Sequence, residues 1–176
     1  AAGTRDERLP VLARALEGGH ETGAHERRLA DTGAADDGHQ RLIADAVAYA
    51  SDRKQFGKAL SDFQLVQAMI ADSKTETMAA KALVLEAAAA KDAEKPITLE
   101  AAAAKYFPSE TVGRVADCAV QIFGGAGYIA DYGIERLYRD VRLFRIYEGT
   151  SQIQQLVIAR EAIKKERWRS IRGPAM

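Results

Sequence analysis

Helical periodicity governs the chain from about Gln40 onward. In the first such segment, apolar residues recur at i, i+1, i+4, i+5 and i+8, which places them on one wide face of a helix. Gly57 favours a break, so we expect this first helix to end there. The apolar face consists of Leu42, Ile43, Ala46, Val47 and Ala50.

A second helix is predicted from about Ser61 to Ala93. Ser61 and Gln64 have the spacing of a capping box, in which two side chains satisfy backbone N–H groups at a helix start. Many interior positions of this segment are alanine or small polar residues. Small side chains let neighbouring helices pack closely, so we expect this helix to lie against its neighbours.

A third helix is predicted over residues 99–123, after Pro96 and Thr98. Pro108 lies inside this segment, and a proline removes one backbone hydrogen bond and crowds the preceding turn. We therefore expect a kink near residues 104–108. The glycines at positions 124, 125 and 127 would then stop the helix.

The two ends of the chain differ from this pattern. Residues 1–38 contain several glycines and few apolar residues after Leu16, so we expect an irregular or partly disordered lead-in, with a short helix near residues 9–16 as an option. A final helix is expected over residues 150–164, followed by a basic tail at 165–176 that frays. Three long helices and a shorter one, with no convincing strand, predict an all-α fold: an antiparallel four-helix bundle over residues 39–164.

Composition narrows the range of functions. The chain has 176 residues, enough for one domain, and its 25 basic and 25 acidic side chains give a formal net charge of zero. That balance does not support general binding to nucleic acid, and no apolar run is long enough for membrane insertion. The single cysteine, Cys118, cannot form an internal disulfide, and no zinc-like spacing suggests a metal site. No signal peptide is visible, which favours the cytoplasm, with the mitochondrial matrix as an alternative.

The stretch from Ile146 to Gln154 carries the clearest chemical signal. Glu148 stands between Tyr147 and a glycine, directly before a predicted helix start at which Ser151 and Gln154 have capping-box spacing. The apolar neighbours Ile146 and Tyr147 would desolvate the carboxylate and make it a stronger base. The alternative is a surface glutamate in the loop before a helix cap.

Three further clusters have the composition of ligand-binding segments. They are residues 53–57, 63–67 and 121–128. An arginine offers a planar fork for a phosphate or carboxylate, and adjacent glycines let the backbone approach a phosphate or a flat ring. Each cluster also has a purely structural alternative. Arg53 can interact favourably with the dipole at a helix C-terminus, and Gly124 can be a C-cap residue.

Taken together, these clusters resemble the C-terminal domain of the acyl-CoA dehydrogenase family. The resemblance covers about residues 40–163, and Arg53 precedes Gln121 and Glu148 by the intervals of that family. A further match places Glu26, Arg27 and Arg28 at the start of the family's first C-terminal helix. The shared motifs are Arg-x-Gln-Phe-Gly, Phe-Gln-x-x-Gln, Gln-Ile-Phe-Gly-Gly-x-Gly-Tyr, Glu-Arg-x-x-Arg-Asp and Ile-Tyr-Glu-Gly-Thr-Ser-Gln-Ile-Gln.

The resemblance assigns a role to each matched residue. Glu148 would be the catalytic base, because the position used by other branches of the family matches Arg27, which cannot act as a base. Gly149 and Arg28 would lie on the acyl-CoA side. Arg136, Arg139 and Asp140 would form structural ion pairs. The residues implied in FAD binding, in part to a flavin of a neighbouring subunit, are Arg53, Gln55, Phe56, Gln64, Gln121, Ile122, Phe123, Gly124, Gly125, Thr150, Ser151 and Gln152.

The implied function is FAD-dependent α,β-dehydrogenation of an acyl-CoA thioester to a trans-2-enoyl-CoA. The family's partners would then be acyl-CoA, an electron-transfer flavoprotein and further copies of the chain in a dimer or tetramer. The chain resembles the last of the family's three parts, so we expect it to be inactive alone. Two alternatives remain: a non-catalytic helical-bundle assembly domain, and an acyl-CoA oxidase.

Overall fold

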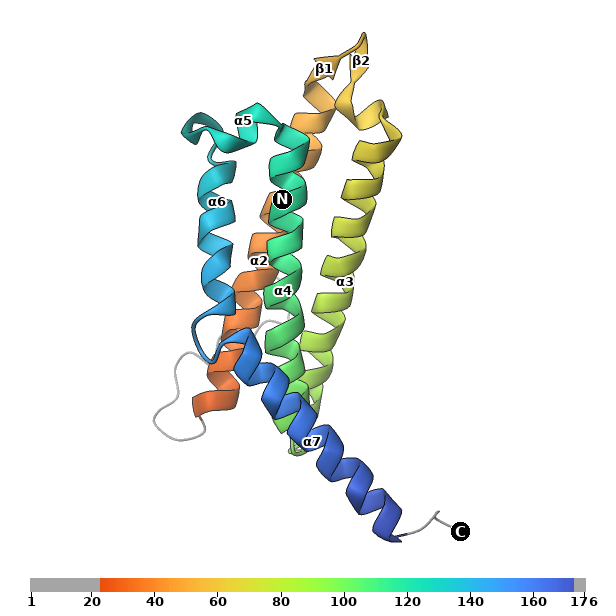
Figure 1. Ribbon diagram of the computed structural model, residues 1–176, viewed down its shortest axis with the longest axis vertical. Helices are drawn as coiled ribbons and strands as arrows, with labels where there is room; N and C mark the ends of the chain where they lie inside the picture. Colours follow the sequence, from red (N-terminus) through yellow and green to blue (C-terminus); the bar gives the residue numbers. More distant parts are fainter. Residues whose placement is uncertain (1–22, 173–176) are drawn as a thin grey trace, which may run out of the picture.

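The computed structural model describes residues 23–172, and it places the side chains of residues 37–168 and of Ser170. Three long helices dominate this part of the chain (Figure 1). They are α2 (Gly23–Asp52), α3 (Gln64–Asp92) and α4 (Thr98–Phe123), and they alternate in direction. The all-α prediction is confirmed. The optional helix near residues 9–16 lies outside the described residues.

The core lies where α2 meets α4. Leu42, Ala46 and Ala50 of α2 are buried against Val115 and Ala119 of α4. The apolar face read from the sequence of the first helix therefore faces the interior as expected, although Val47, at its edge, is exposed. The bundle is completed by α6 (Ile134–Val141), which lies beside α2 and α4 in Figure 1.

Small side chains line the contact between α3 and α4. Ala87 of α3 is packed with Ala101 and Ala104 of α4 and with Ile97, and all four are buried. The alanine-rich composition of these segments thus serves close helix packing. The helix α4 continues through Pro108, and the kink expected there stays a prediction.

The N-terminal lead-in is more ordered than the sequence indicated. Helix α2 begins at Gly23, so residues 23–38 are helical rather than irregular, which corrects the expected boundary at 38. A glycine costs a helix only about 1 kcal/mol relative to alanine. Gly38 lies near Val112 and Phe144, since a Cβ there would lie 3.6 to 3.8 Å from their side chains. The glycines in this segment therefore do not prevent a helix.

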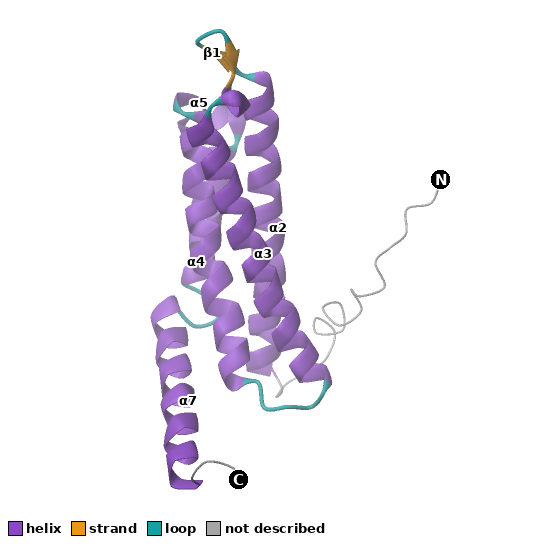
Figure 2. Cartoon of the chain, turned by 90° about the vertical axis from the view of Figure 1, so that its right-hand side faces the viewer, coloured by secondary structure: helices purple, strands orange, loops and turns teal. Residues whose placement is uncertain are grey.

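The last helix is longer than expected. Helix α7 runs from Ser151 to Arg172, so residues 165–172 of the expected tail are helical, and its fraying stays a prediction. It packs against α4 and then projects beyond the end of the bundle, as Figures 1 and 2 show. No helix in the described part of the chain is long and apolar enough to cross a membrane.

A short hairpin between α2 and α3 was not predicted. Strands β1 (Lys54–Gln55) and β2 (Lys58–Ala59) form an antiparallel ladder of two residue pairs. The 3₁₀ turn η1 (Leu60–Asp62) follows, and α3 begins after Phe63 with no side-chain cap. The capping box predicted for Ser61 and Gln64 is therefore wrong, because the turn places Ser61 before the helix start.

The connection from α4 to α7 consists of short elements. They are α5 (Gly125–Tyr128), η2 (Ala130–Tyr132), α6, and η3 (Arg142–Arg145). This connection returns the chain along α4, so that the loop 146–150 before α7 lies beside the middle of that helix.

Candidate functional site

The loop that carries Glu148 has a left-handed backbone. Glu148 has φ 51° and Gly149 has φ 89°. A glutamate in this region costs about 1–3 kcal/mol, and such strain persists where the surrounding structure enforces it. Three non-glycine residues of the described part have positive φ, and two of them, Phe56 and Glu148, are predicted site residues.

The side chain of Gln154 enforces this backbone. Gln154 is completely buried, and its Nε2 donates to the carbonyl oxygens of Glu148 and Gly149, each at 3.2 Å. A Cβ on Gly149 would lie 2.6 Å from Nε2, so the glycine is required by both its φ and its contact. Gln154 was predicted as a capping residue; instead it fixes the loop.

One carboxylate of α4 joins the two ends of the same loop. Arg145, before the loop, pairs with Glu110 at 3.3 Å and also donates to the Glu110 carbonyl oxygen at 3.0 Å. Ser151, after the loop, donates its hydroxyl to Glu110 Oε1 at 2.6 Å. The capping role predicted for Ser151 is therefore wrong, because Thr150 Oγ1 accepts from the Ile153 N–H instead, at 3.4 Å.

Gly113 makes room for this arrangement. A Cβ at Gly113 would overlap the guanidinium of Arg145. Sequence reasoning missed Glu110, Gly113 and Arg145, because each partner lies more than thirty positions away along the chain. No local pattern indicates such a contact.

A buried lysine contacts the segment just before Glu148. Lys105 of α4 is 1% exposed. Its Nζ donates to the Phe144 carbonyl oxygen and to Ser109 Oγ, the latter at 3.3 Å. The ammonium also lies 5.5 Å from the centre of the Tyr147 ring. The sequence gave no sign of this lysine, which sits in an alanine-rich helix.

The Glu148 side chain itself is exposed in this chain. Ile146 is 52% exposed and Tyr147 is 36% exposed. The desolvation expected from these two neighbours is therefore not present, because the Tyr147 ring lies beside Lys105 and Phe144 instead. Any wall that shields Glu148 has to come from outside the described residues.

The hairpin end of the bundle presents the second group of predicted site residues. Arg53, Gln55 and Gln64 are exposed, and Phe56 is 92% exposed. Phe56 has φ 52° and Gly57 has φ 84°, which suits a two-residue hairpin turn. The Phe56 ring makes a T-shaped contact with Phe63, with ring centres 6.3 Å apart, and is otherwise exposed, so this arrangement fits a ligand-contacting role.

The segment 121–125 divides into core and surface. Ile122 and Phe123 are buried, and Phe123 stacks on Tyr49 with ring centres 4.0 Å apart. Their side chains belong to the core, so a cofactor could meet only their backbone. Gln121 is exposed, and a Cβ on Gly124 or Gly125 would meet nothing within 4 Å. Gly124, with φ 60°, also ends α4 as its C-cap residue.

Two site groups therefore lie at different heights on the bundle. Glu110, which holds the Glu148 loop, and Phe123, at the hairpin end, are thirteen residues apart on α4. That interval is about 20 Å along a helix axis at roughly 1.5 Å per residue. The structure brings Glu148–Gln152 together, and it brings residues 53–64 and 121–125 to one end, but it does not join the two groups (Figure 1).

The remaining predicted residues take simple positions. Gln152 is exposed at the start of α7. Arg136 pairs with Asp140 at 3.7 Å, and Arg139 pairs with Glu135 at 3.1 Å, all within α6, as the structural ion-pair interpretation expects. Arg28 lies in α2, but its side chain is outside the described residues, as is that of Arg27.

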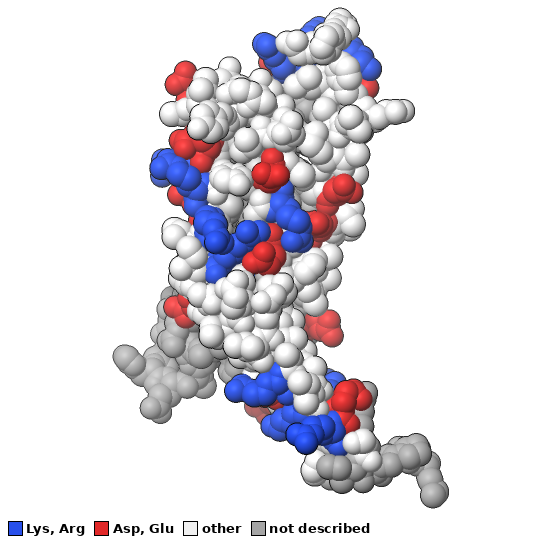
Figure 3. All heavy atoms as spheres, in the orientation of Figure 1, with Lys and Arg blue, Asp and Glu red and all other residues white. Residues whose placement is uncertain are grey.

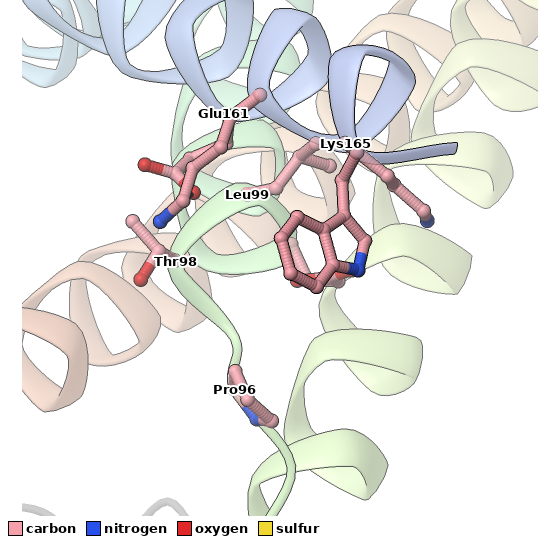
Figure 4. A pocket seen from close by; sticks show the side chains of 8 residues that line it. Pro96, Thr98, Leu99, Glu161 and Lys165 are labelled. Carbon is pink, nitrogen blue, oxygen red and sulfur yellow. Dashed lines mark ion pairs between the residues drawn. The ribbon is translucent and has the colours of Figure 1, made fainter. Parts of the chain in front are cut away.

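Two hollows on the described surface lie away from the predicted site residues. A hollow of about 500 Å³ lies between the start of α4 and the outer part of α7, beside Leu99, Glu161 and Lys165 (Figure 4). Another of about 750 Å³ lies along α7 between Leu156 and Trp168. No predicted site residue lines either one. Charges of both signs alternate on the face in Figure 3, and no group of three or more ligating side chains among the described residues could hold a metal.

Comparison with known proteins settles the family. The family model described as the C-terminal domain of acyl-CoA dehydrogenase matches residues 21–163. The chain belongs to the acyl-CoA dehydrogenase family. The match includes the whole of α2, in agreement with the helix start at Gly23.

Relatives within this family have several named activities. The chain is 51% identical over 126 residues to subunit CarC of the caffeyl-CoA reductase–Etf complex of Acetobacterium woodii, which covers 72% of this chain and 33% of the relative. It is 48% identical over 125 residues to 3-(aryl)acrylate reductase of Clostridium sporogenes, covering 71% and 33%. The butyryl-CoA dehydrogenase structure from Megasphaera elsdenii superposes with a TM-score of 0.78 at 39% identity, covering 81% of this chain and 37% of that one. The chain thus spans about a third of the length of the curated relatives it matches.

Proposed function

We propose that this chain supplies the catalytic base and part of the flavin site of an FAD-dependent acyl-CoA dehydrogenase. The observation that carries the proposal is the strained backbone at Glu148, held by the buried amide of Gln154. Strained residues of this kind cluster at active sites, and a surface glutamate with no role would not need such support. The family of the chain supports the same reading.

In the proposed reaction, the Glu148 carboxylate takes the α-proton of an acyl-CoA thioester. FAD, when bound, would accept the β-hydrogen as a hydride, and the product would be a trans-2-enoyl-CoA. Gly149 and Arg28 would lie on the acyl-CoA side. Because Glu148 is exposed in this chain, the dry environment that a base of this kind uses would come from other domains or subunits.

The hairpin end fits a nucleotide. Arg53 offers charge and donors, and Phe56 offers an exposed aromatic face. Gly124 and Gly125 leave open space above their backbone, which a phosphate or a flat ring could approach. Gln55, Gln64 and Gln121 would add amide contacts.

The distance between the two site groups favours a homo-oligomer. Residues near Glu148 and the start of α7, including Thr150 and Gln152, would face one flavin. The hairpin end, about 20 Å away by helix rise, would face the flavin of a neighbouring copy. One chain would then contribute to two flavin sites, and alone it would hold neither flavin tightly.

A second candidate is the reverse reaction, reduction of an α,β-unsaturated acyl-CoA. Two relatives at 51% and 48% identity are named as reductases, and this observation favours it. In that direction, protonated Glu148 would deliver its proton to the α-carbon. CarC is named as a subunit of an Etf complex, which supports an electron-transfer flavoprotein as the redox partner in either direction.

Flavin absorbance in the complete enzyme tests the proposal. Under anaerobic conditions, a saturated acyl-CoA should bleach the flavin and the corresponding enoyl-CoA should reoxidise the reduced flavin, because the two half-reactions are the reverse of each other. Steady-state turnover with an electron-transfer flavoprotein, measured in each direction, distinguishes a dehydrogenase from a reductase. Rapid hydrogen peroxide release in air would identify the oxidase alternative. A protein that binds no FAD and responds to no acyl-CoA would be the non-catalytic assembly domain instead.

A further inference from the structure

The ammonium of Lys105 is buried inside the bundle. Lys105 is 1% exposed, and the helix around it is rich in buried alanines. Removing an ammonium from water is costly unless its three donors find partners. An apolar side chain of similar length would fill the same volume without that cost.

The partners of this ammonium point to the Glu148 loop. Ser109 Oγ, at 3.3 Å, lies one turn further along the same helix. Two further contacts belong to the segment that leads to Glu148: the carbonyl oxygen of Phe144 and the ring of Tyr147, whose centre lies 5.5 Å from Nζ. A cation at this distance is attracted to an aromatic face.

We propose that Lys105 is a positioning residue for Glu148, acting through Phe144 and Tyr147. Tyr147 directly precedes Glu148, so fixing its ring and the Phe144 carbonyl fixes the entry to the loop. Gln154 fixes the exit from it through the Glu148 and Gly149 carbonyls. The loop is thereby held on both sides of the proposed base. This inference rests on the proposed function of Glu148.

The test uses the complete, FAD-loaded enzyme and Lys105→Met, which keeps length and removes charge. Flavin reduction by a saturating acyl-CoA should slow by about 10–100-fold, the scale expected for a misplaced catalytic group. FAD content and the Kd for acyl-CoA should stay within about twofold of wild type, because Lys105 is predicted to touch neither ligand. A matched control is Val115→Ala, a buried truncation on the same helix in the core cluster with Leu42 and Ala46, which should leave the rate per bound flavin unchanged.

A double-mutant cycle of Lys105→Met and Glu148→Gln distinguishes positioning of Glu148 from a general structural role of Lys105. In a Glu148→Gln background, Lys105→Met should cause no further slowing, since the group it positions is already gone. If the two losses multiply, Lys105 acts by another route and the inference is overturned. A wild-type reduction rate in Lys105→Met alone would overturn it too. If Glu148→Gln reduces its flavin at the wild-type rate, the proposed function fails first, whatever Lys105 does.

A second variant covers the case in which Lys105→Met does not fold. Tyr147→Leu removes the ring from a half-exposed position and leaves Lys105 and Phe144 unchanged. It should slow flavin reduction without loss of FAD or of acyl-CoA affinity. An unchanged rate would overturn the inference.

Discussion

The side-chain nitrogen of Gln154 lies 3.2 Å from the backbone carbonyl oxygen of Glu148. The Gln154 side chain is completely buried, whereas the Glu148 side chain is exposed. The buried side chain of Gln154 thus fixes the backbone conformation of Glu148, the residue proposed to react. A functional group held by packed neighbours keeps its geometry better than one on an unsupported loop.

Replacing Gln154 by leucine should therefore affect both stability and turnover. Two part-buried carbonyl oxygens lose their donor, at about 0.5–1.5 kcal/mol for each hydrogen bond. Flavin reduction per bound FAD should also fall, since Glu148 is no longer held. Urea unfolding and stopped-flow absorbance measure the two effects. The neighbouring Gln155→Leu, which removes only an exposed bond to Tyr106, is the control and should change stability by less than about 0.5 kcal/mol. Equal effects in the two variants would contradict the account.

A comparison of two glycines tests the contact between the loop and Gln154. Gly149→Ala places a Cβ 2.6 Å from Nε2 of Gln154, whereas Gly133→Ala meets nothing within 4 Å, and both glycines have positive φ. Both variants should lose about 1–2 kcal/mol from the left-handed backbone. Gly149→Ala should in addition slow flavin reduction. If both variants reduce flavin at the same rate per folded enzyme, the contact has no role in positioning.

Gly113→Ala should destabilise the protein, although a glycine-to-alanine substitution inside a helix usually stabilises it. In a helix interior, glycine to alanine normally stabilises by about 0.5–1 kcal/mol. At position 113, the added Cβ overlaps the Arg145 guanidinium and would disturb its pair with Glu110. We expect a lower melting temperature. Gly38→Ala, also in a helix but with ordinary contacts of 3.6 to 3.8 Å, should raise it. Two shifts of the same sign would show that Arg145 moves aside without cost.

Phe56→Gly should separate stability from cofactor retention. The substitution relieves a strained φ of 52°, so the bundle should become more stable by up to about 1 kcal/mol. It also removes the exposed ring proposed to contact the nucleotide, so FAD should be lost more readily on gel filtration. Arg53→Ala should weaken FAD retention as well, without the gain in stability. A Phe56→Gly enzyme with full FAD content would remove Phe56 from the proposed flavin site.

The sequence predicted well where the cause is local. The apolar face of Leu42, Ala46 and Ala50 predicted which side of α2 is buried, and periodicity predicted the three long helices. The helix start at Gly23 was missed because glycines at 23, 33 and 38 indicated a break, whereas the helix runs through them. The capping box predicted at Ser61 was wrong because Ser61 lies in a 3₁₀ turn before the helix. The one predicted at Ser151 was wrong because the Ser151 hydroxyl donates to the distant Glu110.

The candidate site shows the same limit. Glu148 and its glycine were found from a short motif, and the motif order identified the family. The residues that hold the loop, Glu110 and Lys105, could not be found, because their partners lie far away in sequence. Contacts between distant segments leave no periodic signal in a single sequence.

The central claim is that Glu148 is the base, and stopped-flow flavin bleaching of Glu148→Gln in the complete enzyme tests it most directly. The amide keeps the shape of the side chain and removes the base, so FAD content and acyl-CoA binding should survive. General-base catalysis contributes about 10²–10⁴-fold, so bleaching by a saturated acyl-CoA should slow at least that much. Glu148→Asp should retain part of the rate, since a carboxylate remains one methylene further back. If Glu148→Gln bleaches its flavin at the wild-type rate, the base lies elsewhere and the account of this site is wrong.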